Sequence, residues 1–130
     1  MSMFHYYSFP HCEVFIFDEF LVTQIREGIV ITPEHNQDLR DIIDLHFLNK
    51  NVVYISNRYF SYAVDPLTYL GTSKIHNLLA IAIVAQDDIK KTNAELESLF
   101  YKKTFEIFPT LSEAMAWVQN VILEKERKKK

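Results

Sequence analysis

The run LLAIAIV, residues 78–84, is apolar at every position and decides the fold that we expect. Strands with this pattern are typical of parallel sheets, in which helices cover both faces. Together with Ala85 it forms the longest uninterrupted apolar run of the chain, far short of the roughly 20 residues that cross a bilayer. We therefore expect a buried central strand and no membrane span.

Two strand-like segments lie near the start of the chain. Residues 13–17 and 20–26 are rich in β-branched and aromatic types and are separated by Asp18 and Glu19. This composition predicts an antiparallel hairpin. Shorter strands are expected at 52–56 and 104–108.

Helices are expected between the strands, because helix start signals follow them. Thr32 is an N-cap candidate, and Pro33 suits the first helical position, where a missing N–H is tolerated. Asp65–Pro66 predicts a brief helix that Gly71, or the residues soon after it, should end.

Two further helices are expected in the second half of the chain. Asp87 and Asp88 cap the first of them, and its expected core-facing stripe consists of Ile89, Leu96, Leu99 and Phe100. Thr110 and Glu113 form a T-x-x-E capping box that begins the last helix.

This order of elements predicts an α/β fold. We expect a mixed sheet of four to five strands that an antiparallel hairpin opens, followed by alternating βαβα with the helices packed on the sheet. The expected division is an aromatic arm at 1–12, one domain at 13–124 and a basic disordered tail at 125–130. The arm, with Phe4, Tyr6, Tyr7 and Phe9, either adds an edge strand or reaches a second subunit to make a homodimer.

Charge and composition exclude several classes of function. The formal net charge is −3, but residues 124–130 hold five basic and two acidic side chains, which leaves the body with a net charge of −6. An acidic body repels phosphate backbones, so we expect no nucleic-acid partner. With Gly28 and Gly71 as its two glycines, the chain cannot form a glycine-rich phosphate loop. The lone Cys12 leaves no internal disulfide and favours a cytoplasmic location.

The stretch YISNRYFSYAVDP, residues 54–66, is the candidate binding segment. It should emerge beyond the carboxyl end of a parallel strand, where open α/β sheets bind ligands. Its candidate ligand- or partner-binding residues are Asn57, Arg58, Tyr59, Ser61, Tyr62 and Asp65, with Phe60 as a further wall. The alternative is that the aromatic side chains fold back onto the core and the arginine pairs with an acid.

The sequence offers little that supports catalysis. A Ser56–His76–Asp65 triad lacks the GxSxG turn of a nucleophile elbow. His11 and Cys12 have no metal-ligand spacing around them, and His46 falls on an apolar helix stripe, as a packed histidine does. We expect no enzyme, no catalytic residue, no metal and no cofactor.

Three stretches of the chain resemble the STAS superfamily, in particular its SpoIIAA-like branch. They are LVTQIREGIVITPEHNQDLRDIID (21–44), VVYISNRYFSYAVDP (52–66) and FEIFPTLSEAMAWV (105–118). The resemblance implies a small non-enzymatic module that binds partner proteins, and some members are switched by serine phosphorylation at a helix start. Here Asp65–Pro66–Leu67–Thr68 opens that helix, so we expect neither Ser56 nor Ser61 to be a regulatory phosphosite.

Two functions follow as expectations. The first is a cytoplasmic regulatory module whose partner is a protein, either a different one or a second copy of the chain. The alternative, which a likeness of some relatives to CRAL-TRIO domains suggests, is a carrier of a small apolar or lipid-like ligand in a pocket between the sheet and the helices.

Overall fold

A six-stranded mixed sheet forms the centre of the protein in the computed structural model, which describes residues 5–129. The sheet order is β1-β2-β3-β5-β7-β8. The strands are β1 (His5–Ser8), β2 (Cys12–Ile16), β3 (Phe20–Ile25), β5 (Val52–Asn57), β7 (Leu78–Val84) and β8 (Thr104–Phe108). The first three pair antiparallel and the rest parallel, which confirms the expected α/β class with its opening hairpin.

The expected number of strands was too low. The arm supplies β1, which pairs antiparallel with β2 and places Tyr6 opposite Phe15 and Tyr7 opposite Val14. Pairing satisfies backbone groups of the β2 edge, and the facing rings of Tyr6 and Phe15 lie 5.1 Å apart. The arm is therefore an edge strand over the residues described, whereas Phe4 lies outside them.

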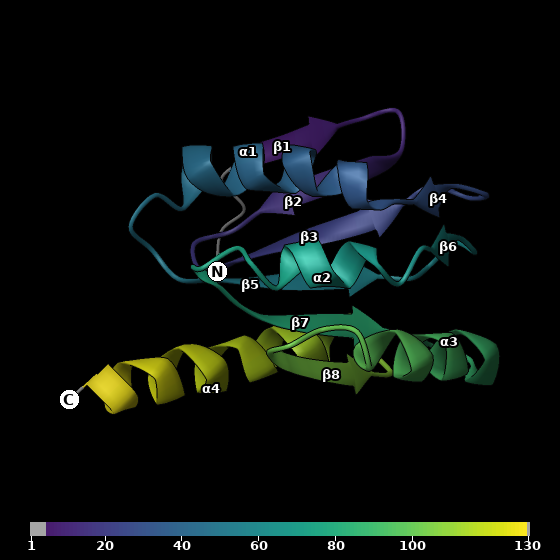
Figure 1. The fold of residues 1–130 in the computed structure, drawn as a ribbon. Coiled ribbons are helices and arrows are strands. Elements are labelled where there is room, and N and C mark those ends of the chain that lie inside the picture. The colour runs from purple at the N-terminus through teal and green to yellow at the C-terminus, as the bar shows by residue number, and fades with distance from the viewer. Residues whose placement is uncertain (1–4, 130) are drawn as a thin grey trace.

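Four α-helices cover the two faces of the sheet (Figure 1). Helices α1 (Asn36–His46), α2 (Thr68–Thr72) and α3 (Asp88–Ser98) pack on one face, and α4 (Leu111–Lys129) packs on the other. The 3₁₀ turn η1 (Pro33–His35) leads into α1. A second, two-stranded parallel sheet joins β4 (Val30–Ile31) to β6 (Ala63–Val64), which sequence reasoning did not foresee.

Strand β7 is buried on both faces, as its composition predicts. Ile81 and Ile83 pack in a cluster with α2 and α3, while Ala80, Ala82 and Val84 pack against α4. The same alternation in β5 directs Val53 and Ile55 toward α4. Tyr54 and Ser56 therefore face the side that α1 and α2 cover.

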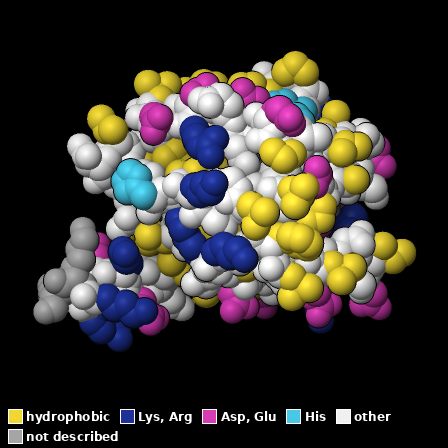
Figure 2. Space-filling model, viewed as in Figure 1, with side chains coloured by type: hydrophobic (Ala, Val, Ile, Leu, Met, Phe, Trp, Pro, Cys, Tyr) yellow, Lys and Arg dark blue, Asp and Glu magenta, His cyan; other side chains and the backbone are white. Residues whose placement is uncertain are grey.

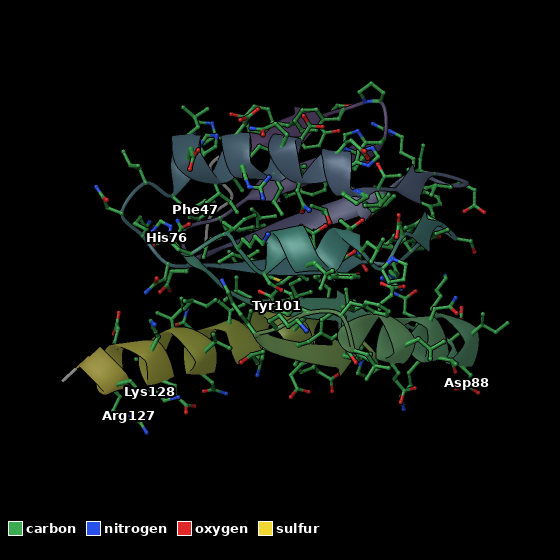
Figure 3. All side chains as sticks on the ribbon, in the orientation of Figure 1. Phe47, His76, Asp88, Tyr101, Arg127 and Lys128 are labelled. Atoms are coloured by element: carbon green, nitrogen blue, oxygen red, sulfur yellow. The ribbon has the colours of Figure 1, made fainter. Side chains whose placement is uncertain are left out.

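The end of the chain differs from the prediction. Residues 125–129 continue α4 instead of forming a disordered tail, and Lys130 lies outside the described residues. Figure 3 shows Arg127 and Lys128 near the end of this helix, away from the sheet. The pair Glu124 and Lys128, at i and i+4 with 3.8 Å between charged atoms, is one local contact that favours the helix here.

Helix α2 ends at Thr72, one residue after Gly71, as the sequence predicts. Gly71 itself lies inside the helix, close to Asn36 of α1. A Cβ atom at this position would stand 2.9 Å from Nδ2 of Asn36, which donates a 2.9 Å hydrogen bond to the carbonyl oxygen of Thr68. The absence of a side chain at Gly71 therefore allows α1 and α2 to approach closely.

Candidate functional site

The predicted binding segment lies between β5 and α2, but its side chains divide between the surface and the interior. Tyr59 and Ser61 are exposed, whereas Asn57 and Asp65 are half-buried. Arg58 is 3% exposed, and the hydroxyl of Tyr62 faces inward. The prediction that Arg58 presents its charge to an outside partner is therefore wrong. The structure agrees with the alternative, in which the arginine pairs with an acid.

Arg58 forms a buried ion pair with Glu97 of α3. Its Nη1 donates a 2.9 Å hydrogen bond to Glu97 Oε2, and its Nη2 donates a short hydrogen bond to Oε1. Tyr69 of α2 also donates its hydroxyl to Glu97 Oε1, and Arg58 Nε donates to the hydroxyl of Tyr62. Because both charges are paired and hydrogen-bonded, the interior tolerates them.

Sequence reasoning missed Glu97 because a charged residue on a helix is usually exposed. One signal was present in the chain. Ala94, Glu97 and Tyr101 recur at helical spacing, and all three are buried in the structure. Figure 3 marks Asp88 at the start of α3 and Tyr101 in the connection between α3 and β8.

Helix α3 consequently turns its apolar residues outward, which corrects the predicted stripe. Ile89 is 76% exposed, Leu96 59% and Leu99 75%, whereas Phe100 is half-buried. The predicted binding segment between β5 and α2 lies beside α3, since Lys90 Nζ of α3 donates a hydrogen bond to the carbonyl oxygen of Tyr59.

These residues form a surface shared by three elements, which we name the α2–α3 surface. It consists of Tyr59, Leu67, Leu70, Ile89, Leu96 and Leu99, all of which are exposed. Figure 2 shows hydrophobic side chains gathered where α2 and α3 lie, with both acidic and basic side chains around them. Continuous exposed apolar surface of this kind marks interaction sites more often than scattered single residues do.

A cavity of about 80 Å³ lies on the same side of the sheet, beneath α1 and α2. Aliphatic side chains form much of its wall, including Ile25, Ile42 and Ile81. The lining residues that carry hydroxyl groups are Thr23, Tyr54, Ser56, Tyr62, Thr68, Tyr69 and Thr72. Tyr62 of the predicted segment therefore lines this cavity instead of an open crevice.

Burial keeps the phenols and the thiol that line the cavity uncharged near neutral pH. It raises the pKa of Tyr54 and of Tyr62, and it raises the pKa of the Cys12 thiol to about 12. At the rim, burial together with the neighbouring His35 lowers the pKa of His11, although Asp38 lies 3.7 Å away and opposes the shift.

The structure places no metal cluster and no membrane-crossing helix in the part of the chain that it describes. Within residues 5–129, no three His, Cys, Asp or Glu side chains are arranged to hold a metal ion. Among the described helices, none combines the length and the apolar character needed to cross a membrane.

Comparison with known proteins identifies the fold. No protein-family model and no curated protein sequence matches the chain. A solved structure from Shewanella loihica PV-4, an uncharacterised protein of the DUF3478 family described as having a SpoIIAA-like fold, matches with a TM-score of 0.58. The match covers 91% of this chain and 98% of that one at 14% sequence identity. The protein has a SpoIIAA-like fold.

This agreement confirms the resemblance on which the sequence analysis relied, as far as the fold is concerned. In this SpoIIAA-like domain the segment 57–65 connects β5 to α2, and α3 lies beside it. The α2–α3 surface and the cavity beneath α1 and α2 are two features of the described residues that a partner or a ligand can contact.

Proposed function

We propose that this SpoIIAA-like domain is a non-enzymatic cytoplasmic module that binds another protein through the α2–α3 surface. The observation that carries the proposal is the exposure of Ile89, Leu96 and Leu99 on α3. A helix that keeps three large aliphatic side chains in water gains free energy when a partner covers them, by roughly 25 cal/mol for each Å² of apolar area buried.

The charges around the surface indicate the chemistry of the partner. Four acids, Asp65, Asp87, Asp88 and Glu95, lie on or beside the elements that form it, against the two bases Lys90 and Lys91 of α3, and Lys90 lies 3.5 Å from Asp87. A two-fold contact between identical copies would bring these acids against one another. We therefore propose a different protein, whose binding face is apolar and bordered by Lys and Arg.

The alternative of a lipid-like ligand has less support. Pockets for ligands of that size measure about 300–1,000 Å³, and the cavity beneath α1 and α2 measures about 80 Å³. Its size suits a much smaller molecule.

The proposal is tested with a matched pair of variants. Leu96→Asp places a charge within the α2–α3 surface, and Leu45→Asp places the same charge on α1, where Leu45 is 71% exposed. Proteins from the native cell that wild type and Leu45→Asp retain, and Leu96→Asp loses, are identified by mass spectrometry. The identified partner is then purified and titrated by calorimetry.

We expect Leu96→Asp to weaken that binding at least about tenfold, which corresponds to about 1.4 kcal/mol, and Leu45→Asp to leave it unchanged. Rising salt should also weaken it, because opposite charges border the interface. Equal binding by both variants would refute the proposed surface. A dimer in analytical ultracentrifugation that Leu96→Asp abolishes would instead identify a second copy as the occupant.

A further inference from the structure

The cavity beneath α1 and α2 has a feature that a packed core lacks, namely hydroxyl protons without acceptors. Thr68 is 5% exposed, and its Oγ1 has no hydrogen-bond partner within the described residues. An unpartnered buried hydroxyl costs about 1–3 kcal/mol, so such groups are uncommon in folded proteins.

Tyr54 supplies a second free proton to the cavity. Its hydroxyl accepts a 2.8 Å hydrogen bond from Thr23 Oγ1 and donates to no other group in residues 5–129. Because burial raises its pKa, the phenol keeps its proton near neutral pH. The oxygen is already an acceptor, so its remaining capacity is that of a donor.

The pair Ser56 and Tyr62 supplies a third hydroxyl proton that has no acceptor. Their hydroxyls are 2.8 Å apart, and either can donate to the other. Arg58 Nε already donates to the Tyr62 oxygen at 2.9 Å, so whichever hydroxyl donates within the pair, the proton of the other is left over. Both residues line the cavity.

The rest of the wall determines which acceptor fits. No Lys or Arg is among the described residues that line the cavity, while Asp38 is one of them. An anion would therefore lose its hydration without meeting a fixed positive charge. A neutral acceptor on an apolar body fits better, because Ile25, Ile42 and Ile81 form part of the same wall.

We propose that this cavity is a binding site for a small uncharged molecule with a carbonyl oxygen, which accepts one hydrogen bond from Thr68 and a second from Tyr54 or the Ser56–Tyr62 pair. Its volume of about 80 Å³ is about half of a 150 Å³ cavity known to hold benzene with its six non-hydrogen atoms, so the ligand has about three to four non-hydrogen atoms in the cavity. Binding is reversible, since the pKa of Cys12 near 12 keeps the thiol protonated and unreactive.

Three probes of the same size separate the possible recognition modes. Acetone carries a neutral carbonyl, acetate is its charged counterpart, and isobutene has the same shape without an acceptor. Each is titrated into the full chain, and the chemical shifts of Ile25, Ile42 and Ile81 methyl groups are followed by NMR. For four atoms the dissociation constant is on the order of tens of micromolar at best, and millimolar values are measurable in this way.

We expect saturable shifts with acetone and much weaker ones with acetate and isobutene. Thr68→Val keeps the shape of the side chain and removes the hydroxyl, so it should raise the dissociation constant for acetone about three- to tenfold. Tyr101→Phe is the matched control. The Tyr101 hydroxyl is also buried without a partner, but Tyr101 does not line the cavity, so acetone should bind this variant as it binds wild type.

Several results would overturn the proposal. They are the absence of saturable acetone shifts at the cavity, equal binding of isobutene, tighter binding of acetate, or a Thr68→Val variant that binds acetone as tightly as wild type. The result of the acetone titrations does not depend on whether the α2–α3 surface binds a protein partner. Leu96→Asp lies outside the cavity and should leave acetone binding unchanged.

Discussion

Arg58 of the β5–α2 segment and Glu97 of α3, 39 residues apart in the sequence, meet in a buried two-pronged ion pair. Their side chains are 4% and 10% exposed. The pair fixes the segment that was predicted to bind a partner, and it sets which face of α3 points inward. The apolar side chains of α3 are exposed as a consequence.

Glu97→Ala should destabilise the protein by about 3–5 kcal/mol, because it leaves the Arg58 charge buried without a counter-ion. Urea unfolding monitored by circular dichroism measures the difference. Glu95→Ala is the control, since Glu95 is an exposed acid of the same helix and its loss should change stability by less than about 0.5 kcal/mol. Similar unfolding midpoints for the two variants would contradict the structural role of the pair.

The orientation of α3 gives a second prediction. Ala94 is 0% exposed and Leu96 is 59% exposed. The same change to aspartate should therefore strongly lower the stability of the protein at the first site and leave it nearly unchanged at the second. Ala94→Asp should prevent folding or cost several kcal/mol, because it buries an unpaired carboxylate. Leu96→Asp should stay within about 0.5 kcal/mol of wild type in urea unfolding. A strongly destabilised Leu96→Asp variant would mean that the predicted stripe faces the core after all.

The elements that the sequence predicts well are those with local signals. The run at 78–84 is β7 with the expected bounds. At the start of α4 the Thr110 hydroxyl accepts a hydrogen bond from the Glu113 backbone N–H and donates one to the Glu113 carboxylate, and at the start of α3 Asp87 accepts a hydrogen bond from the Lys90 backbone N–H. Turn chemistry, caps and apolar runs depend on neighbours in the chain, so they can be read without the fold.

The features that sequence reasoning missed depend on residues that are distant in the chain. The face of α3 was assigned from its aliphatic residues, but the Arg58–Glu97 pair and the small Ala94 determine it. The cavity shows the same limit, because Thr68 and Tyr54 come from different elements and have no common motif. Packing decides both features, and hydrophobic periodicity does not encode it.

Gly71 provides a third prediction, since its Cβ would stand 2.9 Å from Asn36 Nδ2. Gly→Ala inside a helix normally stabilises by up to about 1 kcal/mol. Here we expect Gly71→Ala to destabilise by about 1–3 kcal/mol, because Asn36 must give up its buried hydrogen bond to Thr68. Thermal or urea unfolding of the Gly71→Ala variant and of wild type measures this loss of stability.

A double-mutant cycle isolates the cause. In an Asn36→Ala background the clash is absent, so Gly71→Ala should lose most of its effect. Unchanged destabilisation in that background would assign the effect to the helix backbone instead of to Asn36.

The last prediction concerns pH and the histidine that joins β1 to α1. The Tyr7 hydroxyl lies 2.5 Å from His46 Nε2, and the rings of His5 and His46 have centroids 4.4 Å apart. Burial, with a smaller effect of His5, lowers the pKa of His46, and burial likewise lowers the pKa of His11. The folded state therefore binds fewer protons than the unfolded state as the pH falls below the usual histidine value of about 6.5.

The direction of the pH dependence follows from that difference in proton binding. The contribution of these neutral histidines to the free energy of unfolding is present in full above about pH 6.5, and it is lost as the pH falls from there toward the lowered pKa values of the folded state. Unfolding free energies from urea titrations at pH 7.5 and pH 5.5 should thus decrease toward the lower pH, before the carboxylates titrate. His46→Gln, which stays neutral, should show a smaller decrease than wild type. A His46→Gln variant with the full wild-type dependence would exclude His46 as a source of the effect.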